Sequence, residues 1–249
     1  MNKLMIRVKN KYEYFSGIEL KVLTSVIAII VGTLGFILIA AFVSRGSTDI
    51  IDIKILKSFR HADNLTLPLG PRWLFEIMRD ITSLGGAPIL TLITLFVIGY
   101  FILKKQYSML IIILLAVTGG AVMELELKEL FGRIRPQIIP NLIAEKSFGF
   151  PSGHSMMSAI MYLSLAALIA RLQTRWRDKI YIISIAVFLS FMIGISRVYL
   201  GVHYPTDVLG GWSLGLAWAS FCWFIAWYLG NKNSGRILNG SKEDLTRNG

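Results

Sequence analysis

Two of the three histidines stand among other polar residues in a chain that is otherwise rich in apolar runs. His154 ends the tetrapeptide Pro-Ser-Gly-His, and His203 precedes Asp207 by four residues. If Pro205 opens a helix, Asp207 lies in its first turn, within reach of the His203 imidazole. An Asp–His hydrogen bond fixes the tautomer and leaves the other ring nitrogen free to attack. The spacing therefore predicts His203 as a nucleophile, Asp207 as the residue that orients it, and His154 as general acid and base.

Three cations accompany these histidines. Lys128 and Arg135 lie in one polar cluster, and Arg197 lies in another. Arginine forks match phosphate oxygens bidentately, and lysine adds a point charge. Ser152 and Gly153 are expected to open a helix, whose backbone N–H groups and dipole also favour an anion. Each cation alone could be an interfacial anchor, but the five residues together predict a cradle for a phosphate group.

The acidic residues near these clusters do not form a recognisable metal site. The sequence has no HExxH motif and no Cys/His spacing typical of zinc, and Asp207 is the only acidic residue in a strong position. No metal and no cofactor are therefore expected. Glu124 stands four residues before Lys128, which is the spacing of a helical ion pair. We expect Glu124 to orient Lys128, the alternative being a chemical role for an ionisable group inside a membrane.

The composition explains where such clusters would have to work. The 249 residues are 54% hydrophobic and 16% charged, against about 25% charged residues in ordinary globular domains. A bilayer is the natural explanation for so little charge. The net charge of +11 could indicate nucleic acid, but the basic residues gather between apolar runs, as cytoplasmic loop charges do. No nucleic-acid partner is expected.

Six apolar stretches are long enough, or nearly so, to be membrane helices. Lys and Arg gather in the two terminal segments and in the second-to-third and fourth-to-fifth connections, which share one face if there are six spans. Cytoplasmic connections carry an excess of Lys and Arg, so both termini are expected inside and the three polar clusters on the outer face. The predicted spans are Val22–Val43, Pro88–Leu103, Ser108–Leu127, Ser155–Ala170, Ile180–Ile195 and Val208–Leu229.

The first outer loop, Ser44–Ala87, contains a second kind of helical pattern. Within Arg72–Leu84, apolar residues recur at helical spacing between charged ones. This pattern predicts an amphipathic helix on the outer membrane surface; the alternative is a helix packed over a core of the loop's own. The predicted fold is all-α, a six-transmembrane-helix bundle with an amphipathic helix in its first outer loop. It forms one membrane-embedded domain over residues 1–249, with residues 1–21 and 231–249 as polar tails.

The three clusters resemble the signature of the type 2 phosphatidic acid phosphatases (PAP2), which reads KxxxxxxRP, then PSGH, then SRxxxxxHxxxD. All internal spacings agree, and the resemblance spans roughly residues 84–230. It implies a six-helix membrane fold and a phosphohistidine intermediate formed without metal. At a flanking position, Glu124 stands where the family is expected to have asparagine or another neutral polar residue. Carried over by position, His203 resembles the nucleophile, Asp207 its partner and His154 the acid/base, while Lys128, Arg135, Ser152, Gly153 and Arg197 resemble the phosphate cradle.

The resemblance implies a hydrolase acting on a lipid phosphate or diphosphate, such as undecaprenyl diphosphate, phosphatidylglycerol phosphate or phosphatidic acid. The expected partners are this substrate and membrane lipids, and no oligomeric state is predicted. The expected location is a bacterial inner membrane, with the site on the outer face. Two alternatives are a vanadate-dependent haloperoxidase, whose relatives are soluble, and a catalytically silent lipid-phosphate binding or transport protein. The six apolar spans argue against the first, and the retained His203 and Asp207 argue against the second.

Overall fold

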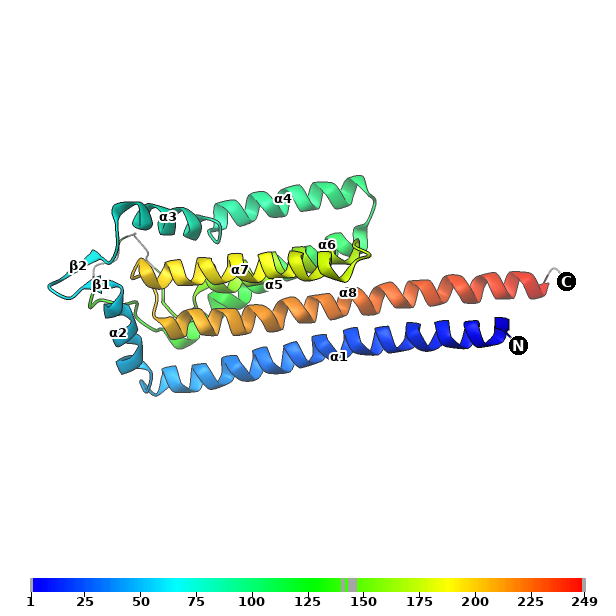
Figure 1. Ribbon diagram of the computed structural model, residues 1–249, viewed down its shortest axis with the longest axis horizontal. Coiled ribbons are helices and arrows are strands. Elements are labelled where there is room, and N and C mark those ends of the chain that lie inside the picture. The colour runs from blue at the N-terminus through cyan, green and yellow to red at the C-terminus, as the bar shows by residue number, and fades with distance from the viewer. Residues whose placement is uncertain (1, 140–141, 143–146, 248–249) are drawn as a thin grey trace.

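The chain folds into a helical bundle with one small hairpin. The computed structural model describes residues 2–139, 142 and 147–247, and the side chains of residues 22–139, 142 and 147–229. Along this part of the chain the elements are α1 (Asn2–Ser44), α2 (Asp49–Ser58), β1 (Arg60–His61), β2 (Asn64–Pro68), α3 (Arg72–Ser83), α4 (Ala87–Leu103), α5 (Tyr107–Phe131), α6 (Gly153–Arg171), α7 (Trp176–Tyr199) and α8 (Pro205–Arg247) (Figure 1).

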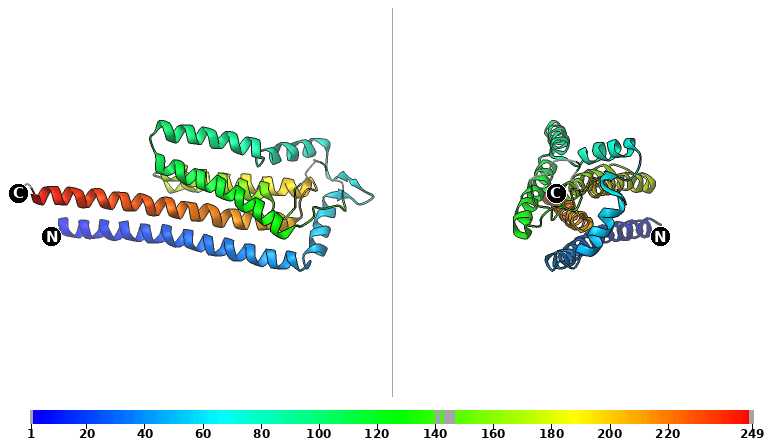
Figure 2. Two further views of the ribbon diagram at one scale, coloured as in Figure 1. Left: turned by 180° about the vertical axis from the view of Figure 1, so that it is seen from behind. Right: turned by 90° about the vertical axis from the view of Figure 1, so that its left-hand side faces the viewer.

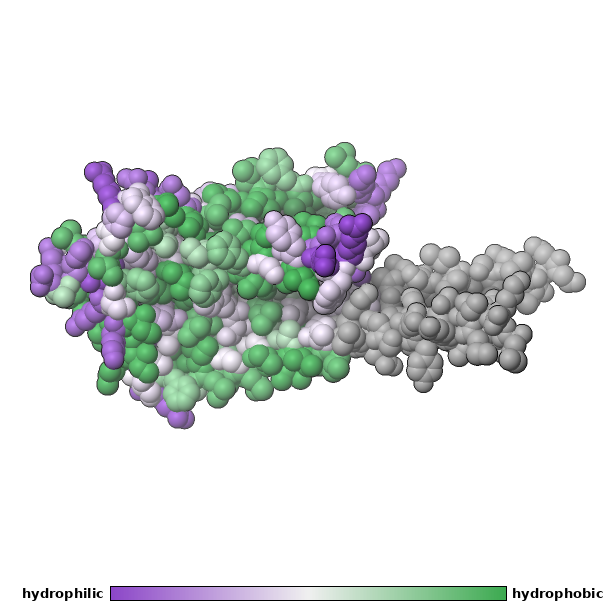
Figure 3. Space-filling view, viewed as in Figure 1, coloured by the Kyte–Doolittle hydropathy of each residue, from purple (hydrophilic) through white to green (hydrophobic). Residues whose placement is uncertain are grey.

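Five helices are long and apolar enough to cross a membrane: α1 from Val22, α5, α6, α7, and α8 as far as Leu229. α4 has 17 residues. That is about 26 Å at 1.5 Å per residue, slightly short of a hydrocarbon core of about 30 Å. It reaches spanning length when joined to α3, from which it is bent by 44°. Apolar side chains cover the middle of the bundle and polar ones gather at its ends (Figure 3). The chain is a multi-pass membrane protein, and the predicted all-helical membrane fold is confirmed.

Small residues let α8 lie close to its neighbours. A Cβ added to Gly211 of α8 would stand 2.6 Å from the Ser152 carbonyl oxygen, at the start of α6. A Cβ added to Gly32 of α1 would stand 2.6 Å from the Ser213 carbonyl oxygen of α8. Such close backbone approach is typical of helices packed inside membranes. α8 therefore packs against both α6 and α1, and it lies near the centre of the end-on view in Figure 2.

The segment 44–87 closes one end of the bundle, here called the loop end (Figures 1 and 2). It holds α2, a helix that the apolar pattern did not predict, then the β1–β2 hairpin and α3. The apolar residues Leu74, Phe75 and Met78 of α3 pack against the chain at the end of α7, whereas Trp73 and Ile77 are exposed. α3 thus packs on the helical bundle rather than on a core of the loop's own.

As far as the structure describes them, the two segments predicted as polar tails continue the terminal helices. α1 begins at Asn2 and α8 ends at Arg247. A helix satisfies its backbone hydrogen bonds internally, so it can continue past an apolar stretch into a polar one without a break. The side chains of residues 1–21 and 230–249 lie outside the described set.

Candidate active site

All eight predicted site residues lie at the loop end of the bundle, on α5–α8 or the connections between them. α5 ends at Gly132, whose φ of +55° is a conformation that glycine adopts without strain. The chain then leaves the helix and carries Arg133 and Arg135 toward the start of α8. Lys128 lies in the last turn of α5, Ser152 caps α6, Gly153 and His154 open it, Arg197 lies in the last turn of α7, His203 follows α7, and Asp207 lies in the first turn of α8.

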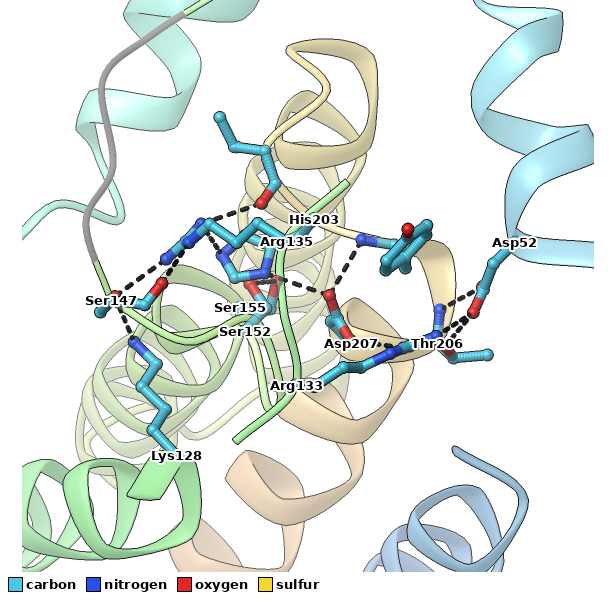
Figure 4. Close-up of polar contacts among 12 residues, drawn as sticks. Asp52, Lys128, Arg133, Arg135, Ser147, Ser152, Ser155, His203, Thr206 and Asp207 are labelled. Carbon is cyan, nitrogen blue, oxygen red and sulfur yellow. Dashed lines mark hydrogen bonds and ion pairs between the residues drawn. The ribbon is translucent and has the colours of Figure 1, made fainter. Parts of the chain in front are cut away.

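His203 is held between a carboxylate and a guanidinium (Figure 4). Its Nδ1 lies 3.4 Å from Asp207 Oδ2, and its Nε2 lies 2.9 Å from Arg135 Nη1. Because a guanidinium can only donate, Nε2 accepts and the ring proton is on Nδ1, facing Asp207. Both contacts therefore specify the tautomer whose Nε2 lone pair can attack an electrophile.

The surroundings of His203 keep its imidazole neutral. The side chain is 1% exposed, and this burial is the main reason why its pKa lies well below the ordinary value for histidine. The positive charges of Arg135, Arg197 and Lys128, and then His154, lower the pKa further. An imidazole that stays unprotonated retains its lone pair, which a nucleophile requires.

Asp207 is fully buried and accepts three hydrogen bonds. Oδ2 faces His203 and also accepts from the Tyr204 backbone N–H at 2.9 Å. Oδ1 accepts from Arg133 Nη1 at 2.6 Å. A buried carboxylate is stable when its oxygens are satisfied in this way. Both oxygens are thus fixed in the orientation that His203 requires.

Arg135 and Lys128 converge on Ser147, from the connection between α5 and α6. Arg135 donates to Val202 O at 2.9 Å, to Ser147 O at 2.6 Å and to Ser147 Oγ at 2.9 Å. Lys128 Nζ lies 3.4 Å from the same hydroxyl. Two of the three cations predicted to bind phosphate are therefore neighbours, joined through one serine (Figure 4).

The predicted Glu124–Lys128 ion pair is present, with Nζ 2.6 Å from Oε1. Its carboxylate also reaches α6, since a Cβ added to Gly153 would overlap it. A glycine at the first position of α6 is what allows this approach. Glu124 therefore places a negative charge beside Lys128 and beside the N-terminus of α6, two features that favour an anion.

The remaining cradle residues, Ser152, Gly153 and Arg197, are buried. Ser152 N–H donates to Asp207 O at 2.9 Å, and Ser155 Oγ donates to Ser152 Oγ at 3.0 Å. Arg197, 1% exposed, donates from Nη1 to Thr82 Oγ1 at 3.1 Å. These contacts tie the start of α6 to α8 and the end of α7 to α3.

His154 lies in the first turn of α6, next to the break between α3 and α4. A Cβ added to Gly86 would stand 3.7 Å from His154 Nε2. The ring is partly buried, and it is close enough to His203 to affect the pKa of that residue. The start of α6 therefore brings His154 near His203.

Two residues of the site were not singled out from the sequence. Arg133 stands inside the first cluster, and its only signal was a second arginine two positions before Arg135. Ser147 gave no signal, because nothing in its flanking sequence marks it. Among the described residues, no group of three His, Cys, Asp or Glu side chains is placed to hold a metal ion.

Comparison with known proteins identifies this arrangement. The PAP2 superfamily model matches residues 106–231, which contain all three polar clusters. The chain belongs to the PAP2 superfamily. The three clusters predict this resemblance over roughly residues 84–230, and the match confirms it. The chain is a membrane phosphatase of this family.

Two relatives cover most of the chain. A phosphatidylglycerophosphatase B of Bacillus subtilis (strain 168) is 38% identical over 183 residues, 73% of this chain and 86% of the relative. The crystal structure of a transmembrane PAP2-type phosphatidylglycerolphosphate phosphatase from Bacillus subtilis has a TM-score of 0.69 and 34% identity, covering 82% of this chain and 96% of the other. An undecaprenyl-diphosphatase of Sulfolobus acidocaldarius is 38% identical over 74 residues, 30% of this chain and 31% of the relative.

Proposed function

We propose that this membrane phosphatase hydrolyses a lipid phosphate monoester of the phosphatidylglycerol phosphate type through a phosphohistidine on His203. The observation that carries the proposal is the position of His203. Its Nε2 lone pair faces Arg135 and its Nδ1 faces Asp207. The substrate class is supported by the Bacillus subtilis relatives, which match most of this chain.

The reaction begins when a phosphate group enters the cradle of Lys128, Arg135, Ser152, Gly153 and Arg197. Arg135 then donates to a phosphoryl oxygen instead of Nε2, and the freed lone pair attacks phosphorus. The bond from phosphorus to the lipid oxygen breaks, and His154 gives its proton to that oxygen.

The second half of the reaction regenerates the enzyme. His154, now neutral, removes a proton from water, and the water oxygen attacks the phosphorus bound to Nε2. The N–P bond breaks, inorganic phosphate leaves, and both histidines return to their starting states. Asp207 stabilises the positive charge that the His203 ring carries while it bears the phosphoryl group.

A second candidate substrate is a polyprenyl diphosphate. It is favoured by the Sulfolobus acidocaldarius undecaprenyl-diphosphatase, whose likeness covers 31% of that protein. The same cradle and nucleophile would release the terminal phosphate. The two substrates differ in the charge and bulk that lie beyond the reacting phosphorus.

The experiment that tests the function measures phosphate release by purified protein in detergent from one panel of phosphatidylglycerol phosphate, phosphatidic acid and undecaprenyl diphosphate. We expect the highest kcat/KM with phosphatidylglycerol phosphate, and a rate with His203→Ala that is indistinguishable from background. A wild-type rate equal to background on the whole panel contradicts the proposed function. A clear preference for the diphosphate favours the second candidate.

The proposed topology has six spans, with α4 as the second, both termini in the cytoplasm and the loop end at the outer face of a bacterial cytoplasmic membrane. Its support is the charge at the other end, where the α4–α5 connection carries Lys104 and Lys105, Arg171 ends α6, and Arg175 lies in the α6–α7 connection. Single cysteines introduced into a Cys222→Ser background test it. A membrane-impermeant maleimide on intact cells should label Asp63→Cys in the hairpin and not Lys104→Cys, and the reverse pattern contradicts the topology.

A further inference from the structure

The helix α2 contributes a buried carboxylate to the loop end. Asp52 is fully buried although α2 lies in a connecting segment. Its Oδ2 accepts from Thr206 Oγ1 at 2.5 Å and from Arg133 Nη2 at 2.8 Å, and its Oδ1 accepts from the Thr206 N–H at 3.1 Å. A buried charge needs this degree of satisfaction to be stable. Asp52 thus fastens α2 both to the start of α8 and to Arg133 (Figure 4).

Arg133 connects Asp52 to the proposed catalytic pair. Its Nη1 donates to Asp207 Oδ1 at 2.6 Å and to Thr206 Oγ1 at 2.8 Å, while its Nη2 faces Asp52. The guanidinium also lies over the Tyr204 ring, 4.4 Å from the centroid. Burial alone would lower the pKa of Arg133, but the carboxylates of Asp207 and Asp52 more than offset this and raise it. Arg133 therefore stays positively charged, and both of its terminal nitrogens, Nη1 and Nη2, are held by hydrogen bonds.

The consequence for Asp207 follows from its own contacts. Oδ2 has to face His203 while Oδ1 faces Arg133. An arginine side chain has many rotamers, so one held at a single end would be free to shift, and Asp207 Oδ1 would shift with it although the Tyr204 N–H still holds Oδ2. Asp52 restricts this movement because it accepts a hydrogen bond from Nη2 of the same guanidinium.

We propose that Asp52 and Arg133 are positioning residues for catalysis, and that α2 is part of the catalytic apparatus rather than a passive connection. The inference rests on the proposed function, since it assigns His203 as the nucleophile. Asp52 orients Arg133, Arg133 orients Asp207, and Asp207 holds the His203 tautomer. Neither Asp52 nor Arg133 contacts the phosphate cradle within the described contacts, so substrate binding should not depend on them.

The test compares Asp52→Asn and Arg133→Lys with Asp49→Asn. Asp49 is a matched control, because it stands one turn earlier on α2 and contacts the same Nη2 at 3.3 Å, but its side chain is 58% exposed. Losing a buried hydrogen bond to a charged group should lower kcat about 10- to 100-fold in Asp52→Asn and Arg133→Lys. KM and inhibition by inorganic phosphate should stay within about threefold of wild type. Asp49→Asn should keep kcat within about twofold.

A purely structural role for Asp52 predicts a different result. It would lower the unfolding temperature of Asp52→Asn while leaving the kcat of the folded protein unchanged, and that outcome overturns the proposal. The double variant Asp52→Asn/Arg133→Lys gives a second test, because the two residues act through one guanidinium. The kcat of the double variant should be about equal to that of the less active single variant. If the two losses in kcat multiply instead, Asp52 and Arg133 act independently, and the proposal is contradicted.

A spectroscopic readout separates this inference from the proposed function. The ¹⁵N signals of His203, assigned by their disappearance in His203→Gln, report the ring tautomer without any turnover. Wild type should show the Nδ1–H tautomer, and Asp52→Asn should show a mixture. If wild type hydrolyses no lipid phosphate but these signals behave as expected, the function is wrong and the positioning stands. If the signals do not change between the two proteins, the positioning is wrong whatever the substrate.

Discussion

Replacing Asp207 by asparagine tests how strongly the reaction depends on one carboxylate. Arg133 Nη1 reaches its Oδ1 at 2.6 Å, while the Tyr204 N–H at 2.9 Å and His203 Nδ1 at 3.4 Å face Oδ2. An asparagine of the same shape offers one oxygen and one NH₂ group. At least one of these donors would then face another donor in a fully buried site.

The guanidinium decides how the new amide turns. Its contact is the shortest and is charged, so the amide oxygen should face Arg133 and the NH₂ group should face His203. The imidazole then takes its proton on Nε2, which removes the lone pair that attacks phosphorus. The Tyr204 N–H loses its acceptor, and the His203 contact survives only in the unreactive tautomer; at about 1.5–3 kcal/mol for each of these two changes, the expected loss is about 10²- to 10⁴-fold in kcat.

The assay is the initial rate of phosphate release from lipid phosphate in detergent, with kcat and KM determined separately. KM should stay within about threefold, because Asp207 does not belong to the cradle. Thermal unfolding in the same detergent shows whether the variant is folded. A folded Asp207→Asn protein with kcat within about tenfold of wild type refutes the claim that this carboxylate sets the tautomer.

Three further predictions follow from single contacts. Glu124→Gln removes a negative charge from the cradle and should strengthen inhibition by inorganic phosphate about three- to tenfold, whereas Glu126→Gln, exposed on the same helix, should not change it. Gly211→Ala places a Cβ against backbone and should cost about 1–3 kcal/mol of stability, seen as a lower unfolding temperature. Gly99→Ala, with open space around it, should leave that temperature unchanged. His203 should titrate below the ordinary histidine pKa, so its imidazole stays neutral as the pH falls through about 6.5; ¹⁵N shifts that show protonation at or above that pH contradict this.

Much of the helical framework could be predicted from the sequence because it depends on local pattern. Apolar runs marked α1, α4, α5, α6, α7 and α8, and the alternation of spans placed the three polar clusters together at one end. The Glu124–Lys128 pair was also predictable, since it depends on one helical turn. These features need only the period of a helix and the thickness of a bilayer.

The residues that hold the site residues in place, Asp52, Thr206 and Arg133, could not be predicted in the same way. Asp52 and Thr206 are 154 positions apart, and no periodicity relates an acidic residue in a connecting segment to a helix so distant in the chain. α2 is ten residues long and not markedly amphipathic, so its pattern did not distinguish it from a loop. Arg133 was visible in the sequence, but its role depends on Asp52, which only the fold brings beside it.

The most direct test of the account is to trap the covalent intermediate. Enzyme mixed with a lipid phosphate carrying radiolabelled phosphorus is quenched in base, which preserves phosphohistidine, and the labelled peptide is mapped. We predict label on His203 Nε2 and none in His203→Ala. In His154→Gln, the labelled phosphohistidine should accumulate when the substrate has a leaving group that departs without being protonated. Label on His154, or turnover by His203→Ala at the wild-type rate, contradicts His203 as the nucleophile.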